Sequence, residues 1–135
     1  CMDFIRKPKD FDVVVASNLF GDILTDIGAM ITGGLGLASS GNISFNDDNP
    51  SMFEPTHGSA PDIAGKDLAN PIAQILTGAM MLSHLGENKA ANDIREAVVK
   101  TLKNGNNLTS DLGGTSKTDQ CTNEIIRHIW IQTKN

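Results

Sequence analysis

The sequence has few cysteines and few aromatic residues. Its 135 residues include no tyrosine, one tryptophan and two cysteines, Cys1 and Cys121. The cysteines are far apart and lack the spacing of a metal site, so we expect two free thiols in a reducing compartment. No apolar run reaches about 18 residues, which excludes a membrane-spanning helix.

No targeting signal is visible, and the first residue is Cys rather than Met. We therefore expect a segment of a longer chain, whose N-terminal part would carry any targeting sequence. The expected location is the cytoplasm, or the mitochondrial matrix in a eukaryote.

Clustered positive charge is also absent. The net charge is −5, and the short run Arg6-Lys7-Pro8-Lys9 is followed by Asp10. Because phosphate contacts need clustered Lys and Arg, we expect no nucleic acid or anionic membrane as partner. An anionic substrate stays open, since a bound divalent cation can reverse the local field. The length and the 39% hydrophobic content are those of one soluble globular domain.

Residues 53–71 carry Gly, Pro, Ser, Asn and Asp at close intervals, which predicts a long structured loop. Loops of this length inside a domain are usually functional or disordered. We expect order, because Pro55 and Pro61 stiffen the loop and Ile63 and Leu68 give it apolar groups to bury.

The chemistry of this loop suits a nucleotide. Gly58, Ser59 and Ala60 are small and expose their N–H groups to ligand oxygens. His57 offers a ring for stacking, and an ionised Asp62 could accept from two ribose hydroxyls. The amide of Asn70 suits an adenine edge. The alternative is a loop whose polar groups only satisfy one another.

Upstream, the β-branched run within residues 11–17 predicts a buried strand. Asn18 then offers an N-cap, and apolar residues at helical spacing predict a helix that ends near Gly33-Gly34. On this helix Asp22 and Asp26 are four residues apart, and like charges at that spacing cost roughly 0.2–0.5 kcal/mol. A divalent cation would make the pair favourable, whereas the alternative is a solvated helix face.

The remaining pattern predicts loops and helices in alternation. We expect a loop over residues 33–41, a solvated turn over Asn46-Asp47-Asp48-Asn49-Pro50 and a further loop over 108–114. Predicted helices follow Asn70-Pro71 up to Gly86, run from Asn88 to Gly105, and extend from a capping Thr118 to about Trp130. Ile125, Ile126 and Ile129 should be buried, and His84 and His128 should lie at the surface.

Two strings resemble one known family. EPTHGSAPDIAGKDLANP (residues 54–71) is similar to the cofactor loop of the β-decarboxylating dehydrogenases, which act on isopropylmalate, isocitrate, homoisocitrate or tartrate/D-malate. ASNLFGDILTDIGA (residues 16–29) resembles their metal helix, and SDLGG (residues 110–114) a further segment near the adenine. The resemblance implies an α/β fold of the isocitrate/isopropylmalate dehydrogenase type, with residues 1–135 as its C-terminal portion.

By position, the resemblance implies that Asp22 and Asp26 bind Mg²⁺ or Mn²⁺ beside the substrate hydroxyl. It also implies an NAD-binding set in which His57 faces adenine, Asp62 holds the ribose and Asn70 touches the base. The whole set comprises Glu54, His57, Gly58, Ser59, Ala60, Pro61, Asp62, Ile63, Asn70 and Asp111.

The resemblance also implies that no catalytic residue lies in this segment. The family's substrate-binding arginines, catalytic Tyr and catalytic Lys are expected upstream. A third metal-binding Asp should stand just before Cys1, and Asp3 is out of register. Because the Lys and that Asp come from the partner subunit in family dimers, we expect a homodimer or higher homo-oligomer, and no activity from this chain alone.

The implied reaction is the NAD- and metal-dependent oxidative decarboxylation of a small-molecule 2-hydroxy acid. The strings ASNLFGDILTDIGA and Asn49–Pro55 favour tartrate or D-malate, followed by isocitrate and then isopropylmalate. The alternative is a non-catalytic regulatory or dinucleotide-binding subunit of the same fold. Such a subunit would be expected to lose metal or cofactor residues, and those available here are intact.

Asp62 predicts a preference for NAD over NADP. A 2′-phosphate would meet a carboxylate of like sign, and the neighbouring Ile63 adds no positive charge. Asp62→Lys together with a basic neighbour should shift the preference toward NADP. Steady-state kinetics of the full-length enzyme measure this, and comparable catalytic efficiency of the parent with both cofactors would refute it.

Overall fold

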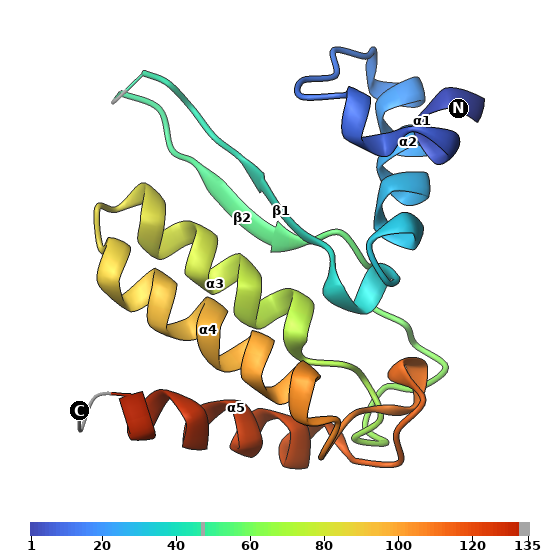
Figure 1. Cartoon of the computed structure of the whole chain (residues 1–135). Helices are drawn as coiled ribbons and strands as arrows, with labels where there is room; N and C mark the ends of the chain where they lie inside the picture. The colour runs from blue at the N-terminus through green and yellow to red at the C-terminus, as the bar shows by residue number, and fades with distance from the viewer. Residues whose placement is uncertain (47, 133–135) are drawn as a thin grey trace.

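The computed structural model describes residues 1–46 and 48–132 as five helices, a two-stranded ribbon and three short 3₁₀ turns (Figure 1). Among these residues, no helix is long and apolar enough to cross a bilayer. The helices are α1 (Met2–Arg6), α2 (Asn18–Ile31), α3 (Ile72–His84), α4 (Asn88–Asn104) and α5 (Thr118–Gln132). The strands are β1 (Ser39–Asn42) and β2 (Met52–Pro55), and the 3₁₀ turns are η1 (Pro8–Asp10), η2 (Leu35–Leu37) and η3 (Ser110–Leu112).

The centre of the fold is α3, which is covered on two sides. Figure 1 shows α4 beside α3 and α5 beside α4, three helices that are called the helical layer below, while the β1–β2 ribbon packs against the other side of α3. Alanines at the contacts of α3 and α4 let the two helices approach closely. Ile72 packs with residues of α4 and α5 in a buried cluster that comprises Ile72, Ala97, Val98, Cys121 and Ile125.

Glycines follow α3 and α4 at the predicted places. Gly86 and Gly105 have φ of +86° and +68°, a left-handed conformation that glycine adopts without a steric penalty. At the other end of α3, the side-chain oxygen of Asn70 accepts a hydrogen bond from the Ile72 N–H at 2.9 Å. The predicted Asn-Pro start of this helix is shifted by one residue, because Pro71 stands at the N-cap position and Ile72 is the first helical residue.

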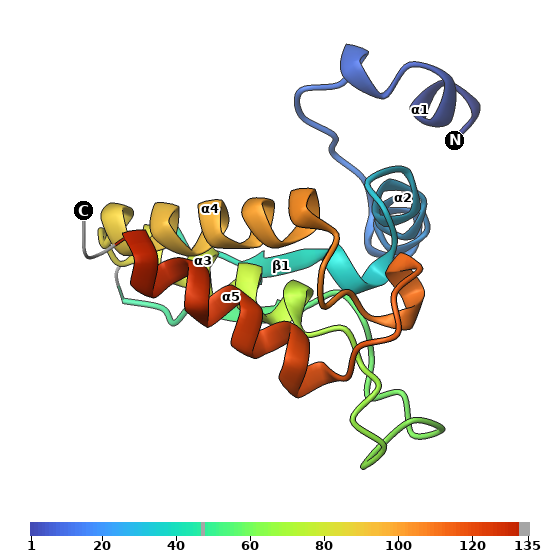
Figure 2. The ribbon, with the colours of Figure 1, turned by 60° about the horizontal axis from the view of Figure 1, so that its bottom comes forward.

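The N-terminal part forms a limb outside the helical layer (Figure 2). The ring of Phe4 on α1 lies close to Gly28 on α2 and meets Phe11 edge-on, with 5.4 Å between ring centroids. The large apolar side chains of α2 stay in contact with solvent, and Leu19 and Phe20 are 67% and 63% exposed. Within the described residues this limb has no apolar layer to cover it.

The buried strand predicted for residues 11–17 is wrong for this structure. The segment is extended but unpaired, and Val13 and Val15 are 84% and 94% exposed. A strand needs a neighbour to satisfy its N–H and C=O groups, and no strand among the described residues pairs with this segment.

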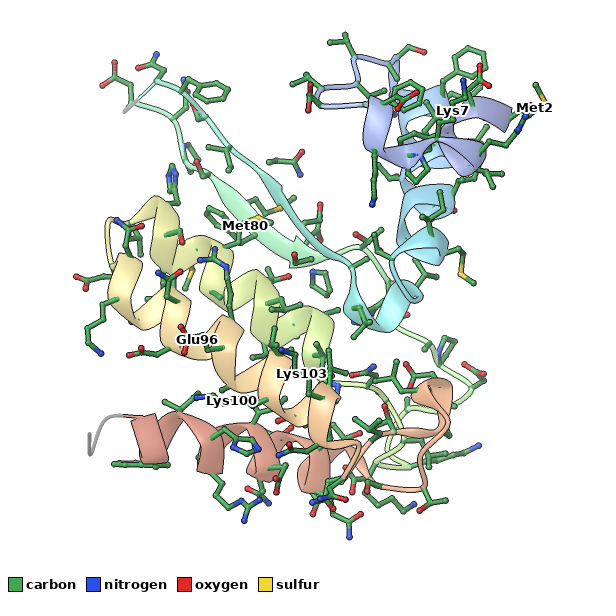
Figure 3. All side chains as sticks on the ribbon, viewed as in Figure 1. Met2, Lys7, Met80, Glu96, Lys100 and Lys103 are labelled. Atoms are coloured by element: carbon green, nitrogen blue, oxygen red, sulfur yellow. The ribbon has the colours of Figure 1, made fainter. Side chains whose placement is uncertain are left out.

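A strand instead forms within the predicted loop 33–41. β1 pairs with β2 in an antiparallel register that sets Gly41 opposite Phe53. A Cβ on Gly41 would lie 3.1 Å from the Phe53 ring and 3.2 Å from the Met80 sulfur, which points from α3 toward the ribbon (Figure 3). The glycine that suggested a loop is thus the residue that lets the ribbon pack on α3. The turn at 46–50 is confirmed by the Asn49 N–H to Asn46 carbonyl bond, while Asp47 lies outside the described residues.

Three predictions about α5 are corrected. The Thr118 hydroxyl does not cap this helix, because it donates to the carbonyl of Ala69 at 2.6 Å. His128 is buried rather than at the surface, and Ile126 is 42% exposed. The reason is the orientation of the helix, which turns the face of Cys121, Ile125 and His128 toward α4.

A buried carboxylate, that of Glu124, links α5 to the segment that follows α4. Glu124 is 7% exposed and accepts hydrogen bonds from Arg127 and, at 3.3 Å, from the amide of Asn107. The ring Nε2 of His128 lies 3.2 Å from the same carboxylate. The Arg127 hydrogen bond is the main reason that the pKa of Glu124 is lowered from its ordinary 4.5, with desolvation acting in the opposite direction.

This pKa gives a prediction about acid stability. A carboxyl whose pKa is lowered by folding adds stability that is complete above its unfolded pKa and is lost as pH falls through the folded value. Glu124→Gln should therefore lose about 1 kcal/mol at pH 7. It should also show a shallower decline than the parent below pH 4.5, the ordinary value for this group.

Urea unfolding at a series of pH values measures both effects. The matched control is Glu96→Gln on α4, because Glu96 is exposed (Figure 3). Equal acid slopes for the parent and Glu124→Gln would contradict the assignment.

Candidate functional site

A cleft of about 980 Å³ lies between α2, the β1–β2 ribbon and the residues that follow β2. Four of the predicted site residues line it, namely Asp22, Glu54, His57 and Gly58. They come from segments more than 30 positions apart in the sequence. The fold therefore brings part of the predicted metal helix and part of the predicted nucleotide loop to one cleft.

Asp22 and Asp26 stand one turn apart on α2, and both are exposed. Neither carboxylate forms a hydrogen bond or ion pair with any described residue. Asp22 faces the cleft, whereas Asp26 borders a small apolar hollow beside Ile5 and Met30. Within the described residues, both carboxylates are therefore available to bind a cation.

The carboxylates of Asp22 and Asp26 can supply some of the ligands that a hard divalent ion needs. The described residues contain no cluster of three His, Cys, Asp or Glu side chains that could hold a metal. Mg²⁺ and Mn²⁺ sites commonly take only one or two carboxylates and complete the shell with water and substrate oxygens. Two aspartates without a partner among the described residues fit that pattern.

The loop at residues 56–70, called the 56–70 loop below, extends beyond the helical layer (Figure 2). Its shape depends on left-handed backbone at Ala60, Gly65 and Asp67, whose φ values are +42°, +73° and +56°. A hollow of about 280 Å³ lies under it, lined by loop residues and by Thr118 of α5. Sequence reasoning had not connected α5 with this loop.

The exposed part of the loop leaves its polar groups available. The N–H groups of Gly58, Ser59 and Ala60 form no hydrogen bond with a described residue, and neither does the carboxylate of Asp62. The ring nitrogen Nδ1 of His57 lies 3.0 Å from the Gly58 carbonyl oxygen. Unpaired donors beside an unpaired carboxylate fit a ligand that carries both anionic oxygens and hydroxyls, as a dinucleotide does.

Asn70 and Asp111 meet at the end of the loop. The Asn70 amide donates to Asp111 at 2.8 Å, and the buried Thr109 hydroxyl donates to the other carboxylate oxygen of Asp111 at 2.6 Å. Since the Asn70 oxygen also caps α3, this pair joins the loop, η3 and the first turn of α3. The sequence named both residues as cofactor contacts, and the structure shows them holding each other.

The predicted residues do not all share one surface. Pro61 and Asp62 lie at the exposed part of the loop and border neither the cleft nor the hollow. Ser59, Ala60 and Ile63 line the hollow but not the cleft. The cleft also contains polar residues that the sequence had not marked as site residues. They are Asn18, Thr25, Thr32, Ser39, Ser40, Asn42 and Thr56. Asn18 carried a usable signal, because it precedes Asp22 by one helical turn.

Comparison with known proteins gives consistent matches along the chain. The family described as isocitrate/isopropylmalate dehydrogenase matches residues 1–129. The alpha subunit of NAD isocitrate dehydrogenase from Rattus norvegicus mitochondria is 49% identical over 129 residues, which are 96% of this chain and 35% of that protein. A probable tartrate dehydrogenase/decarboxylase from Bacillus subtilis is 52% identical over 126 residues, or 93% of this chain and 35% of that protein.

A solved structure agrees with these sequences. The isocitrate dehydrogenase from Methylococcus capsulatus matches with a TM-score of 0.88 and 45% identity, over 95% of this chain and 38% of that one. This chain therefore spans little more than a third of the length of the proteins that it resembles.

The close packing around the Asn70–Asp111 pair gives a test of its structural role. A Cβ on Gly36 would lie 2.6 Å from the Asp111 carboxylate and 2.8 Å from the Asn70 amide nitrogen. Gly36→Ala should therefore separate the pair and destabilise the fold by roughly 1–3 kcal/mol, as overpacking does.

Thermal unfolding measures the change. The matched control is Gly78→Ala on α3, where nothing lies within 4 Å of the added methyl group, so the higher helix propensity of alanine should raise stability slightly. A melting temperature of Gly36→Ala equal to that of the parent would show that the pair tolerates the methyl group.

Proposed function

Because the chain belongs to the isocitrate/isopropylmalate dehydrogenase family, as its motifs predicted, we propose that it forms the metal- and cofactor-binding portion of an NAD-dependent β-decarboxylating dehydrogenase. The reaction would be the oxidative decarboxylation of a 2-hydroxy acid of the malate type. The observation that carries the proposal is the meeting of Asp22 with His57 and Gly58 at one cleft.

In this proposal Asp22 and Asp26 bind Mg²⁺ or Mn²⁺ through carboxylates that have no protein partner among the described residues. When bound, the divalent ion supplies Lewis acidity toward the substrate hydroxyl, and NAD supplies a hydride acceptor. The N–H groups of Gly58 to Ala60 would orient the cofactor by donating to its oxygens. Asp62 would accept from the hydroxyls of its adenosine ribose.

The acid–base groups of the reaction are expected outside this chain, which has no tyrosine. For this reason the 135 residues alone should show no dehydrogenase activity. The full-length protein is proposed to be a homodimer or higher homo-oligomer, and the exposed apolar side chains of α2 are available for burial by the upstream part or by a second subunit. Its proposed location is the cytoplasm, or the mitochondrial matrix in a eukaryote.

The substrate is proposed in the order tartrate or D-malate, isocitrate, then isopropylmalate. The relatives support both of the first two, since the Bacillus protein is 52% and the rat protein 49% identical. The test is a substrate panel on the full-length protein with NAD and Mn²⁺. Turnover of none of these acids would refute the proposed reaction.

A non-catalytic regulatory subunit of the same fold is the second candidate. A subunit that no longer catalyses would be expected to lose charge at the metal helix or donors in the loop. Asp22 and Asp26 are both present and have no partner among the described residues, and the same holds for the N–H groups of Gly58 to Ala60. These features favour the catalytic proposal.

The metal assignment gives a direct prediction. Asp26→Asn keeps the shape of the side chain but removes its charge, so Mn²⁺ affinity and turnover of the full-length enzyme should fall together. The affinity should fall at least about tenfold, since even the loss of an outer-shell partner typically costs 10–100-fold.

Titration with Mn²⁺ measures the affinity, and Asp12→Asn is the matched control because Asp12 is exposed and lies before α2. An affinity of Asp26→Asn equal to that of the parent would sink the assignment.

A further inference from the structure

The end of the 56–70 loop is attached to the first turn of α5, about 50 positions later in the chain (Figure 1). The Thr118 N–H donates to the Asp67 carbonyl at 3.1 Å, and the Thr118 hydroxyl donates to the Ala69 carbonyl at 2.6 Å. The Asp119 N–H donates to the Asp67 carboxylate at 3.3 Å. The Lys117 ammonium adds a contact of 3.4 Å to the Lys66 carbonyl.

Asp67 has two properties that this attachment needs. Its φ of +56° lies in the left-handed region, which Asp and Asn tolerate better than most residues with a side chain. Its carboxylate accepts from one of the N–H groups that have no partner within the first turn of a helix. Asp67 therefore caps α5 from a distant part of the sequence, while Thr118 uses its hydroxyl for the loop.

The helix to which the loop is attached is anchored in the core. Cys121 and Ile125 follow on the same helix and are buried in the core with Ile72. At the other end of the loop, the Thr56 N–H donates to the Ala38 carbonyl at 3.1 Å. Between these two points the backbone hydrogen bonds of the loop with described residues are those of its own short turns, among them the Ile63 N–H to Ala60 carbonyl bond.

Attachment near residue 67 therefore shortens the free part of the loop. A loop held only by its ends must lose more conformational entropy when it closes on a ligand. A loop that is already held in its binding shape avoids that cost. The apparent affinity of the protein for the ligand is then lowered only to the extent that some molecules have the loop open. The groups that hold the loop can thus set affinity without touching the ligand.

We propose that Asp67 and Thr118 are positioning residues for the dinucleotide: by fixing the end of the 56–70 loop on α5, they hold the unpaired N–H groups of Gly58 to Ala60 in place. This inference rests on the proposed function, because it takes NAD as the ligand. Neither Asp67 nor Thr118 belongs to the NAD-binding set that the sequence implies.

Three variants separate the parts of the attachment. Thr118→Val removes the hydroxyl and keeps the shape. Asp67→Asn keeps both the acceptor oxygen and the tolerance of left-handed backbone, whereas Asp67→Gly keeps the backbone and removes the acceptor. Thr122→Val is the matched control, since the Thr122 hydroxyl on the same helix bonds only to the Thr118 carbonyl.

Two measurements on the full-length protein test the proposal. Hydrogen exchange of the peptide over residues 58–70 reports opening of the loop, with the peptide over 88–104 as internal reference. Calorimetric titration with NAD gives the Kd, and steady-state kinetics separate KM from kcat. Thr118→Val and Asp67→Gly should each speed loop exchange and raise the Kd for NAD about fivefold, the equivalent of one net hydrogen bond. Asp67→Asn and Thr122→Val should stay within about twofold of the parent, and kcat should not change.

Each other result overturns a defined part. Unchanged exchange in both Thr118→Val and Asp67→Gly would show that the attachment does not hold the loop. Faster exchange with an unchanged Kd would make the attachment structural only. A raised Kd with unchanged exchange would mean direct contact with the cofactor. Failure of the parent protein to bind NAD would refute the proposed function and the positioning role together, while the exchange data would still show whether the attachment holds the loop.

Discussion

The side-chain amide of Asn70 is the contact on which the arrangement of the site depends. Its oxygen accepts from the first N–H of α3, and its nitrogen donates to Asp111 in η3. Gly36 of η2 lies so close to the pair that a methyl group added there would have to displace one of the two side chains. One amide thus sets where the 56–70 loop ends, where the central helix begins and how near the segment after α2 can come.

The polar groups of the scaffold and those of the candidate site differ in whether they have hydrogen-bond partners. In the scaffold, the buried polar side chains Thr77, Thr101, Thr109 and Glu124 all have hydrogen-bond partners, as burial requires. At the site, Asp22, Asp26 and Asp62 have none among the described residues, and three successive loop N–H groups are likewise unpaired. Such groups stay hydrated at little cost while exposed, and they are available when a charged ligand displaces the water. This contrast, rather than any one distance, separates the parts that hold the shape from the parts that can bind.

The distribution of apolar surface follows the same division. Around α3 the core is closed, because the ribbon covers one side and α4 the other. Around α2 it is open, with Leu19 and Phe20 mostly exposed on the helix that also carries both site aspartates. Within the described residues no apolar layer covers α2, and the chain spans about a third of the length of its relatives.

Features that depend on local chemistry can be predicted from the amino-acid sequence alone. Glycines at 86 and 105 end helices because they alone adopt the left-handed conformation freely, and the spacing of Asp22 and Asp26 places both on one face of any helix. The motif strings likewise named the loop and the family. Four other features follow from the three-dimensional arrangement. Gly41 lies in a strand, residues 11–17 stay unpaired within the described residues, His128 is buried, and the Thr118 hydroxyl donates to Ala69 rather than capping its own helix. Each of these depends on a partner distant in sequence or missing from the described residues, and a local pattern carries no information about such a partner.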